Sequence, residues 1–226
     1  MKIFSRLILI LLLAIFAVGL SGEESFSQIT YSPESMSQLW IEGRSNVNEF
    51  ECQANRYVGE ATIFNQQEPV ELIDGGDNQI FLKVQINVDS FDCGRSRMNR
   101  DLREALKSDL FPEITFMFER AELLGISEED EESLEIEVTG QLTVAGETRE
   151  IHFLTKAYYL NDNQVRAVGN TTIRMTDFNV EPPTALMGMI RADEELTVNF
   201  DLIATEREGM CELCTEMLEQ YRNHPE

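Results

Sequence analysis

Apolar and polar residues alternate in three runs in the middle of the chain, at 111–118, 134–144 and 149–153, and a Gly-bearing turn joins the last two. A period of two is that of a β-strand with one buried face, and a turn of this kind between two such runs indicates a hairpin. The same alternation recurs at 80–88 and at 196–202. The pattern therefore predicts an antiparallel sheet with an apolar inner face and a polar outer face.

Taken along the whole chain, the alternation predicts eight strands, at about 37–43, 49–64, 79–89, 113–123, 134–144, 148–160, 164–176 and 194–205. Eight is the number of strands at which an antiparallel barrel can hold one ligand inside. A sandwich of two packed sheets has the same periodicity. The alternation alone leaves these two all-β architectures open.

Two segments break the pattern. Residues 97–107 place Met98, Leu102 and Leu106 on one face at a spacing of four, which predicts a short amphipathic helix that would lie over an open end of a barrel. Residues 177–190 are too apolar for a solvent loop, and their pair of prolines is unsuited to a strand interior.

The amino-acid sequence of these runs resembles that of the YceI-like family of lipid- or polyisoprenoid-binding proteins. The family's first motif, a Pro-x-Ile-x-Phe run, is matched by Phe111, Pro112, Ile114 and Phe116. Its hairpin motif is matched by Gly140, Leu142, Thr143, Val144, Gly146, Thr148, Arg149 and Ile151. The resemblance extends over about 37–205 and implies the barrel, in its lipocalin-like form with an apolar ligand cavity. Asn179 stands where the family usually has Gly, and Asn tolerates the positive φ that such a turn requires.

The first 27 residues are typical of an export signal. Lys2 and Arg6 precede an apolar core at 7–20, and Ser25-Phe26-Ser27 is a small-x-small cleavage site. We therefore expect three parts: a signal peptide at 1–27, one barrel domain at 28–205, and a tail at 206–226 that forms a short helix. The mature protein would be periplasmic or secreted, without stable insertion in the membrane.

The chain is strongly acidic, with 41 Asp and Glu against 18 Lys and Arg and a net charge of −23. The signal segment holds two residues of each sign, so its removal leaves the net charge unchanged. This charge predicts repulsion from phosphate backbones and anionic membrane surfaces, and we expect no nucleic-acid partner. The acidic run at 128–132 lacks the alternating ligands and central Gly of a calcium loop, so it is interpreted as a solvated surface segment.

Four cysteines fall into two pairs. Cys52 and Cys93 flank the second and third predicted strands, and in an exported chain they are expected to form a structural disulfide. Cys211 and Cys214 form a C-x-x-C in the acidic tail, where neighbouring glutamates raise thiol pKa values and so disfavour redox catalysis. A local or intermolecular disulfide is the favoured interpretation of this second pair.

The sequence offers no catalytic residues. His152 falls on the polar phase of its strand, which predicts a surface side chain rather than a general base, and no hydrolase elbow, zinc motif or phosphate-binding loop is present. We expect no enzyme activity, no metal and no cofactor other than a bound isoprenoid or lipid.

The function predicted from the sequence is therefore that of an exported binding protein, which sequesters or carries a polyisoprenoid, quinone tail or fatty amphiphile in its apolar interior. The expected ligand-binding residues share an apolar side chain on an inward strand phase, on the helix or in the irregular segment: Leu82, Val84, Ile86, Met98, Leu102, Phe116, Phe118, Ile136, Val138, Leu142, Phe153, Phe178, Met189, Val198 and Phe200. The alternatives are an envelope interaction module with a closed core and a thiol-based redox role of the C-x-x-C. A homodimer is left open.

Overall fold

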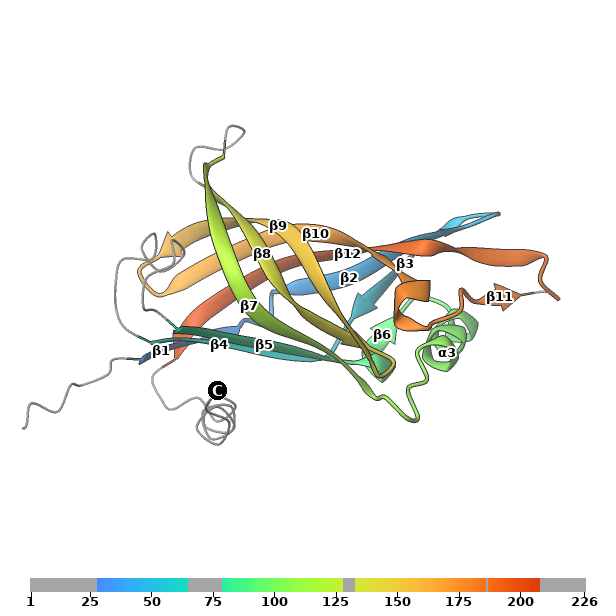
Figure 1. The fold of residues 1–226 in the computed structure, drawn as a ribbon. Coiled ribbons are helices and arrows are strands. Elements are labelled where there is room, and N and C mark those ends of the chain that lie inside the picture. Colours follow the sequence, from blue (N-terminus) through green and yellow to red (C-terminus); the bar gives the residue numbers. More distant parts are fainter. Residues whose placement is uncertain (1–27, 65–78, 128–132, 186, 208–226) are drawn as a thin grey trace, which may run out of the picture.

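The computed structural model describes residues 28–64, 79–127, 133–185 and 187–207. All paired strands run antiparallel, and the strands are labelled as in Figure 1. Their bounds are β1 Gln28–Pro33, β2 Gln38–Ser45, β3 Glu49–Ala54, β4 Tyr57–Phe64, β5 Gln79–Asn87, β6 Phe91–Asp92, β7 Glu113–Ile126, β8 Ser133–Val144, β9 Glu147–Asn161, β10 Gln164–Arg174, β11 Thr184–Ala185 and β12 Ile190–Arg207. The helix α3 spans Ser96–Ala105, and two 3-10 turns span Val88–Ser90 (η1) and Met175–Phe178 (η2).

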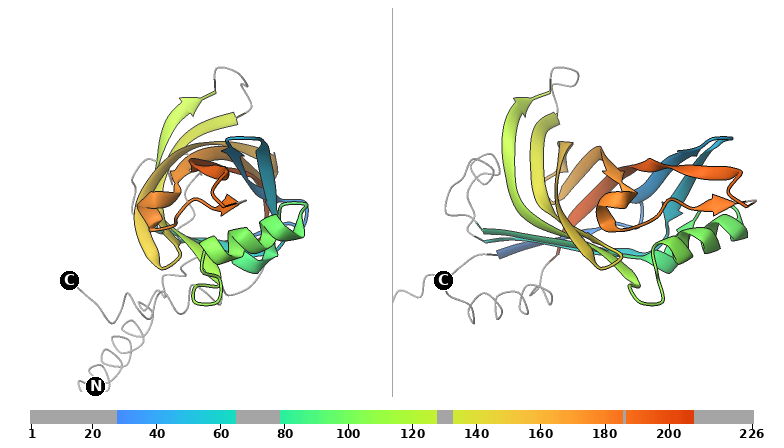
Figure 2. Two further views of the ribbon diagram at one scale, coloured as in Figure 1. Left: turned by 90° about the vertical axis from the view of Figure 1, so that its right-hand side faces the viewer. Right: turned by 45° about the vertical axis from the view of Figure 1, so that its right-hand side comes forward.

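The sheet closes on itself. Its order runs β1, β4, β5, β7, β8, β9, β10, β12, and β12 then pairs with β1 through Thr30–Arg207 to Pro33–Ala204. This closed path of eight antiparallel strands is a barrel, so the sandwich alternative is wrong. Figure 2 shows the ring of strands from one end.

Three strands of the barrel are interrupted and continue beyond the closed ring. Both β1 and β2 pair with β12, β3 continues into β4 across a break at Asn55–Arg56, and the short β6 extends β5. At the first break, the buried Ser37 hydroxyl donates to the Ile203 carbonyl (3.0 Å) and accepts from the Ile203 amide (2.9 Å). The Glu34 amide also donates to the Ile203 carbonyl (2.7 Å), so what the side chain supplies is the acceptor for the Ile203 amide at the break.

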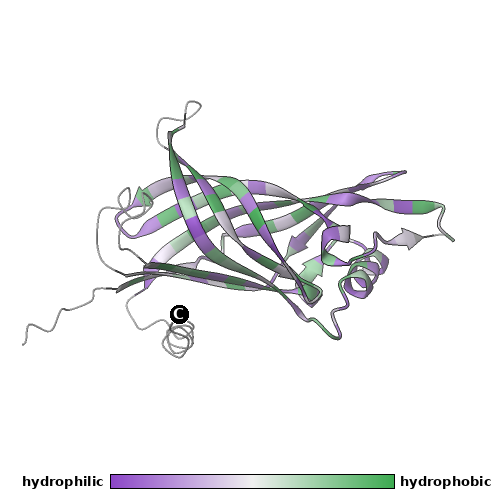
Figure 3. Ribbon diagram, viewed as in Figure 1, coloured by the Kyte–Doolittle hydropathy of each residue, from purple (hydrophilic) through white to green (hydrophobic). Residues whose placement is uncertain are grey.

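A buried apolar cluster closes the barrel at the end that carries α3. Leu102 and Leu106 of the helix region are buried there, as the spacing of four predicts. The cluster also contains Leu39, Ile41, Cys52, Ala54, Ile86, Val88, Phe91, Leu142, Val144, Ala145, Met175, Phe178 and Val180. Asn179 ends η2 with φ 52°, so the left-handed turn expected for this position is confirmed. Figure 3 shows hydrophobic and hydrophilic residues alternating along the strands of the wall.

The eight predicted strands are confirmed, with small shifts of their ends. Strand β1 was not predicted, and the second strand divides into β3 and β4. The signal peptide, the acidic run at 128–132, and the helical tail with Cys211 and Cys214 lie outside the described residues. Within those residues, no helix is long and apolar enough to cross a bilayer.

Candidate functional site

Three phenylalanine rings form a continuous belt on the inner wall of the barrel. They come from alternate strands: Phe116 from β7, Phe153 from β9 and Phe200 from β12. Ring centroids lie 5.6 Å apart between Phe116 and Phe153, and 5.5 Å apart between Phe153 and Phe200 in an edge contact. Both spacings suit favourable aromatic pairs. The belt crosses β8 and β10, whose own side chains must leave room for it.

Glycines on the intervening strands provide that room. Gly140 of β8 lies under the Phe116 ring, and Gly169 of β10 lies under the Phe200 ring. A Cβ at Gly169 would stand 2.6 Å from the Phe200 Cζ and 2.6 Å from the Leu154 carbonyl oxygen. The rings of Phe116 and Phe200 therefore lie against the backbone of a neighbouring strand, where a larger side chain would overlap them.

Small side chains occupy the inward phase on the side of the belt away from α3. The register pairs Ala157 with Ala167, Ala167 with Leu202, and Ala61 with Leu82. These residues keep part of their surface accessible, as do the three phenylalanines of the belt, although all of them point inward. Ile136, Val138 and Thr155 on the same inward phase are buried. Small side chains together with only half-buried ones favour an interior with room for an apolar ligand.

Few polar groups face this interior. Thr155 donates its hydroxyl to the Val168 carbonyl (3.2 Å), so it is already satisfied. By strand alternation, Tyr31 and its register partner Glu206 face inward near the end opposite α3. Burial, and secondarily the charge of Glu206, raise the pKa of the Tyr31 phenol above its usual value. The phenol is neutral at pH 7 and offers a hydrogen bond without a charge.

A second apolar space lies at the α3 end, and three residues of the buried cluster, Cys52, Leu102 and Met175, take part in its lining. It has a volume of about 290 Å³ and lies between α3, the end of the β2–β3 hairpin and the β11–β12 hairpin. Met98, Leu102, Phe50, Ile190, Leu196 and the Cys52–Cys93 disulfide line it, with Arg95 and Arg97 among its polar residues. Two larger hollows, each of about 880 Å³, are lined mainly by polar and charged side chains and offer less to an apolar ligand.

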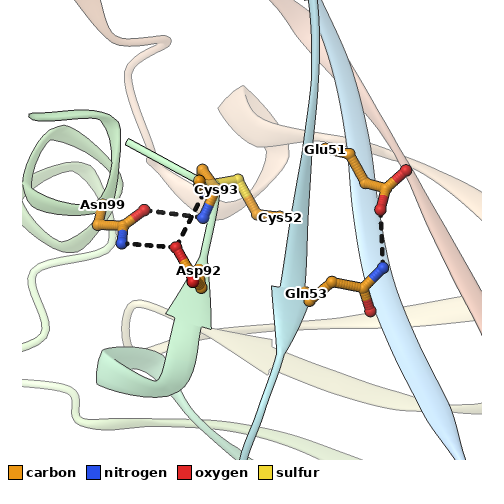
Figure 4. The surroundings of a disulfide bond; sticks show 7 residues. Glu51, Cys52, Gln53, Asp92, Cys93 and Asn99 are labelled. Atoms are coloured by element: carbon orange, nitrogen blue, oxygen red, sulfur yellow. Dashed lines mark hydrogen bonds between the residues drawn. A yellow bond between two sulfur atoms is a disulfide. The ribbon is translucent and has the colours of Figure 1, made fainter. Parts of the chain in front are cut away.

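The disulfide fixes the position of α3 (Figure 4). Cys52 and Cys93 are bonded, as the sequence predicted, and join β3 to the segment that leads into the helix. The Asn99 side chain accepts a hydrogen bond from the Cys93 amide (2.8 Å) and donates one to Asp92 (3.0 Å). That bond from Asn99, with another from the Gly94 amide, lowers the pKa of the Asp92 carboxyl, which therefore stays ionised.

The predicted ligand-binding residues fall into three places. Phe116, Phe153 and Phe200 form the belt, and the strand residues Leu82, Val84, Phe118, Ile136, Val138 and Val198 share its inward phase. Ile86, Leu142, Phe178 and Leu102 belong to the buried cluster, and Leu102 also lines the α3-end space together with Met98. Met189 is 68% exposed at a hairpin turn and belongs to none of these three places. The interior alanines and Gly169 were not singled out from the sequence, and Gly140 was named only as part of the hairpin motif.

Outside the barrel, His152 is exposed on the outer face, as predicted. Its Nδ1 lies 3.0 Å from the Thr139 hydroxyl and its Nε2 3.2 Å from Glu150. No group of three His, Cys, Asp or Glu side chains suited to a metal ion occurs within the described part of the chain.

Replacement of Gly169 by alanine is expected to destabilise the protein by roughly 1–3 kcal/mol, because the new methyl group overlaps a carbonyl oxygen that cannot move away without breaking the ladder. Gly59→Ala is the matched control on another strand, since its Cβ would meet nothing closer than 3.6 Å. Thermal melts of the two variants test this. Equal stability of Gly169→Ala and Gly59→Ala would contradict the close packing of the belt on β10.

Comparisons with known proteins agree with this architecture. The model of the YceI-like domain matches residues 26–204. Similar solved structures include BcnA of Burkholderia cenocepacia, with 19% identity over 75% of this chain and 96% of that one and a TM-score of 0.57. A polyisoprenoid-binding domain from Saccharophagus degradans, implicated in plant cell wall breakdown, gives 13% identity over 78% and 98%, with a TM-score of 0.56.

A YceI protein of Campylobacter jejuni gives 20% identity over 70% of this chain and 85% of that one, with a TM-score of 0.52. At these identities the solved structures establish the fold alone. No curated protein matches the chain. The family match covers most of the chain and the closed barrel agrees with it, and the chain therefore belongs to the YceI-like family.

Proposed function

We propose that this protein is a non-enzymatic binding protein that holds a long hydrophobic chain inside its barrel. The ligand class is a polyisoprenoid, a quinone tail or a fatty amphiphile. The observation that carries the proposal is the inner wall at and beside the aromatic belt, where Ala157 and Ala167 and the belt phenylalanines are only half-buried, while the cluster at the α3 end is buried.

Hydrophobic transfer is sufficient for such binding. Each methylene taken from water contributes about 0.8 kcal/mol, less the cost of ordering the chain. The phenylalanine rings provide apolar contact area along the wall. The Thr155 hydroxyl already donates to the Val168 carbonyl, so an apolar ligand beside it would not leave this donor without a partner. The similar fold of the Saccharophagus degradans protein, a polyisoprenoid-binding domain, supports the same ligand class.

The closed end suggests an orientation for the ligand. Because buried side chains fill the barrel beside α3, the apolar tail would lie along the half lined by small residues, with its end against the belt. The polar end would then lie toward Tyr31 and Glu206. We propose that the protein performs this role after export, in the periplasm or outside the cell, where it sequesters or carries the ligand.

Native mass spectrometry of protein purified from its own host, followed by organic extraction, tests the proposal. The expected result is a mass adduct that organic solvent releases and whose fragments are those of an isoprenoid or acyl chain. An unliganded protein that also fails to bind a fluorescent prenyl probe would contradict it.

A further inference from the structure

The seam that closes the barrel places a phenol and a carboxylate side by side on the inner wall. Tyr31 of β1 is the register partner of Glu206 of β12, so both side chains lie on the same face of the sheet. The register continues from Tyr31 to Ala61 and from Ala61 to Leu82, which is an inward position of β5. Both side chains are half-buried. The pair therefore lies inside the barrel at the end that carries β1, opposite α3 (Figure 1).

The hydrogen-bonding groups of this pair are unused within the described part of the chain. Neither the Tyr31 phenol nor the Glu206 carboxylate has a hydrogen-bond partner or an ion pair among those residues. Burial, and then the charge of Glu206, raise the pKa of the phenol, so it keeps its proton at pH 7. The pair thus combines one donor with an acceptor, and polar groups that face an apolar interior are stabilised when they find partners. Both groups are available to the polar end of a ligand.

The surroundings of the pair contain negative charge and no inward cation. From the aromatic belt to this end of the barrel, Glu206 is the only charged side chain on the inward phase of the described strands. Arg207 lies on the outward phase and pairs with Glu34 (3.3 Å). The connections that follow β4 and β7 in sequence, residues 65–78 and 128–132, contain four and five acidic residues and no lysine or arginine. An anionic group beside Glu206 would therefore be repelled, with no described inward cation to offset the repulsion.

We propose, on the basis of the function proposed above, that Tyr31 and Glu206 select a ligand whose polar end is an alcohol, which is a prenol or a fatty alcohol. A hydroxyl group both donates and accepts, so it can donate to the Glu206 carboxylate while it accepts from the Tyr31 phenol. A hydrogen bond to an ionised partner is the stronger kind. A quinone carbonyl only accepts and would leave the carboxylate without a donor, whereas a phosphate or a carboxylate would bring a second negative charge beside it.

The test is competition between two ligands that differ only at the polar end. Farnesol and farnesyl phosphate are each titrated against a fluorescent prenyl probe bound to the purified protein. Farnesol is expected to displace the probe at a concentration about tenfold lower, or more, than farnesyl phosphate. Glu206→Gln should reduce this preference, and Glu206→Arg should reverse it, because the guanidinium group attracts the phosphate. Tyr31→Phe should weaken farnesol binding roughly two- to tenfold, which is the loss of one hydrogen bond.

Glu137→Gln is the matched control for Glu206→Gln, because it removes the same charge from an exposed position on the outer face of β8. It should keep the preference of the unchanged protein, and melting temperatures verify that each variant is folded. If neither the probe nor farnesol nor farnesyl phosphate binds, the proposed function fails and the selection of an alcohol fails with it. If the probe binds but both ligands displace it equally, or if Glu206→Gln and Glu137→Gln change the preference equally, the selection of an alcohol alone is overturned.

Discussion

Ala167→Trp is expected to weaken binding of a prenyl ligand about a hundredfold while leaving a folded barrel. Ala167 points inward between Ala157 and Leu202, in the half of the barrel lined by small residues. An indole there would occupy the volume of several methylenes of the ligand. Displacing three to four of them costs about 0.8 kcal/mol each, so affinity should fall by roughly a hundredfold. A titration with a fluorescent prenyl probe measures the loss.

Thr172→Trp provides the matched control on the same strand. Thr172 lies on the opposite phase and its side chain is exposed on the outer face, so an indole there should leave binding and stability unchanged. Melting temperatures of both variants complete the test. If Ala167→Trp binds the probe normally, the barrel interior is not the ligand site. If it instead melts far below the parent protein, the interior is already filled.

Removal of the disulfide by Cys52→Ala and Cys93→Ala should destabilise the protein by about 4 kcal/mol. The bond links residues separated by 41 positions, and chain entropy of the unfolded state sets this magnitude for a loop of that length. For a domain of this size the melting temperature should fall by roughly 8–16 °C. Thermal denaturation followed by circular dichroism measures the change.

Dithiothreitol gives an independent control for the disulfide. The reductant should lower the melting temperature of the unchanged protein to that of the double variant and should leave the variant unaffected. Prenyl binding at low temperature should survive in both, since the bond lies at the α3 end and not on the aromatic belt. A reduced protein as stable as the oxidised one would contradict a structural role for this bond.

Strand periodicity was sufficient to predict the strands of the wall because each long strand has one apolar and one polar face, whereas the choice of a barrel over a sandwich came from the family resemblance. Strand β1 escaped prediction since it has six residues, ends at a proline and gains its position from pairing with β12 and β4, which are distant in sequence. The break at Ser37 is likewise invisible locally, because the hydroxyl group bonds to Ile203.

The sequence predicted which side chains of the candidate site face inward, but it did not predict how they pack against the wall. Alternation placed Phe116, Phe153 and Phe200 on the inner face, yet nothing local indicates that glycines two strands apart would let two of the rings lie against the neighbouring backbone. Helical spacing placed Leu102 on the apolar face of the helix. It could not tell whether the side chain contacts a ligand or packs in the buried cluster to which it belongs. Register between strands decides both questions, and register depends on the whole sheet.

Closure of the barrel by its first and last strands sets the order in which the chain can fold. Thr30 meets Arg207 and Pro33 meets Ala204, so the ring has a gap until the segment near residue 207 is available. During synthesis the hairpins from β7 to β10 can form early from neighbouring sequence, but the final seam must wait for almost the entire chain. A pairing so remote in sequence slows folding, and it leaves the ring of the nascent polypeptide open until β12 emerges.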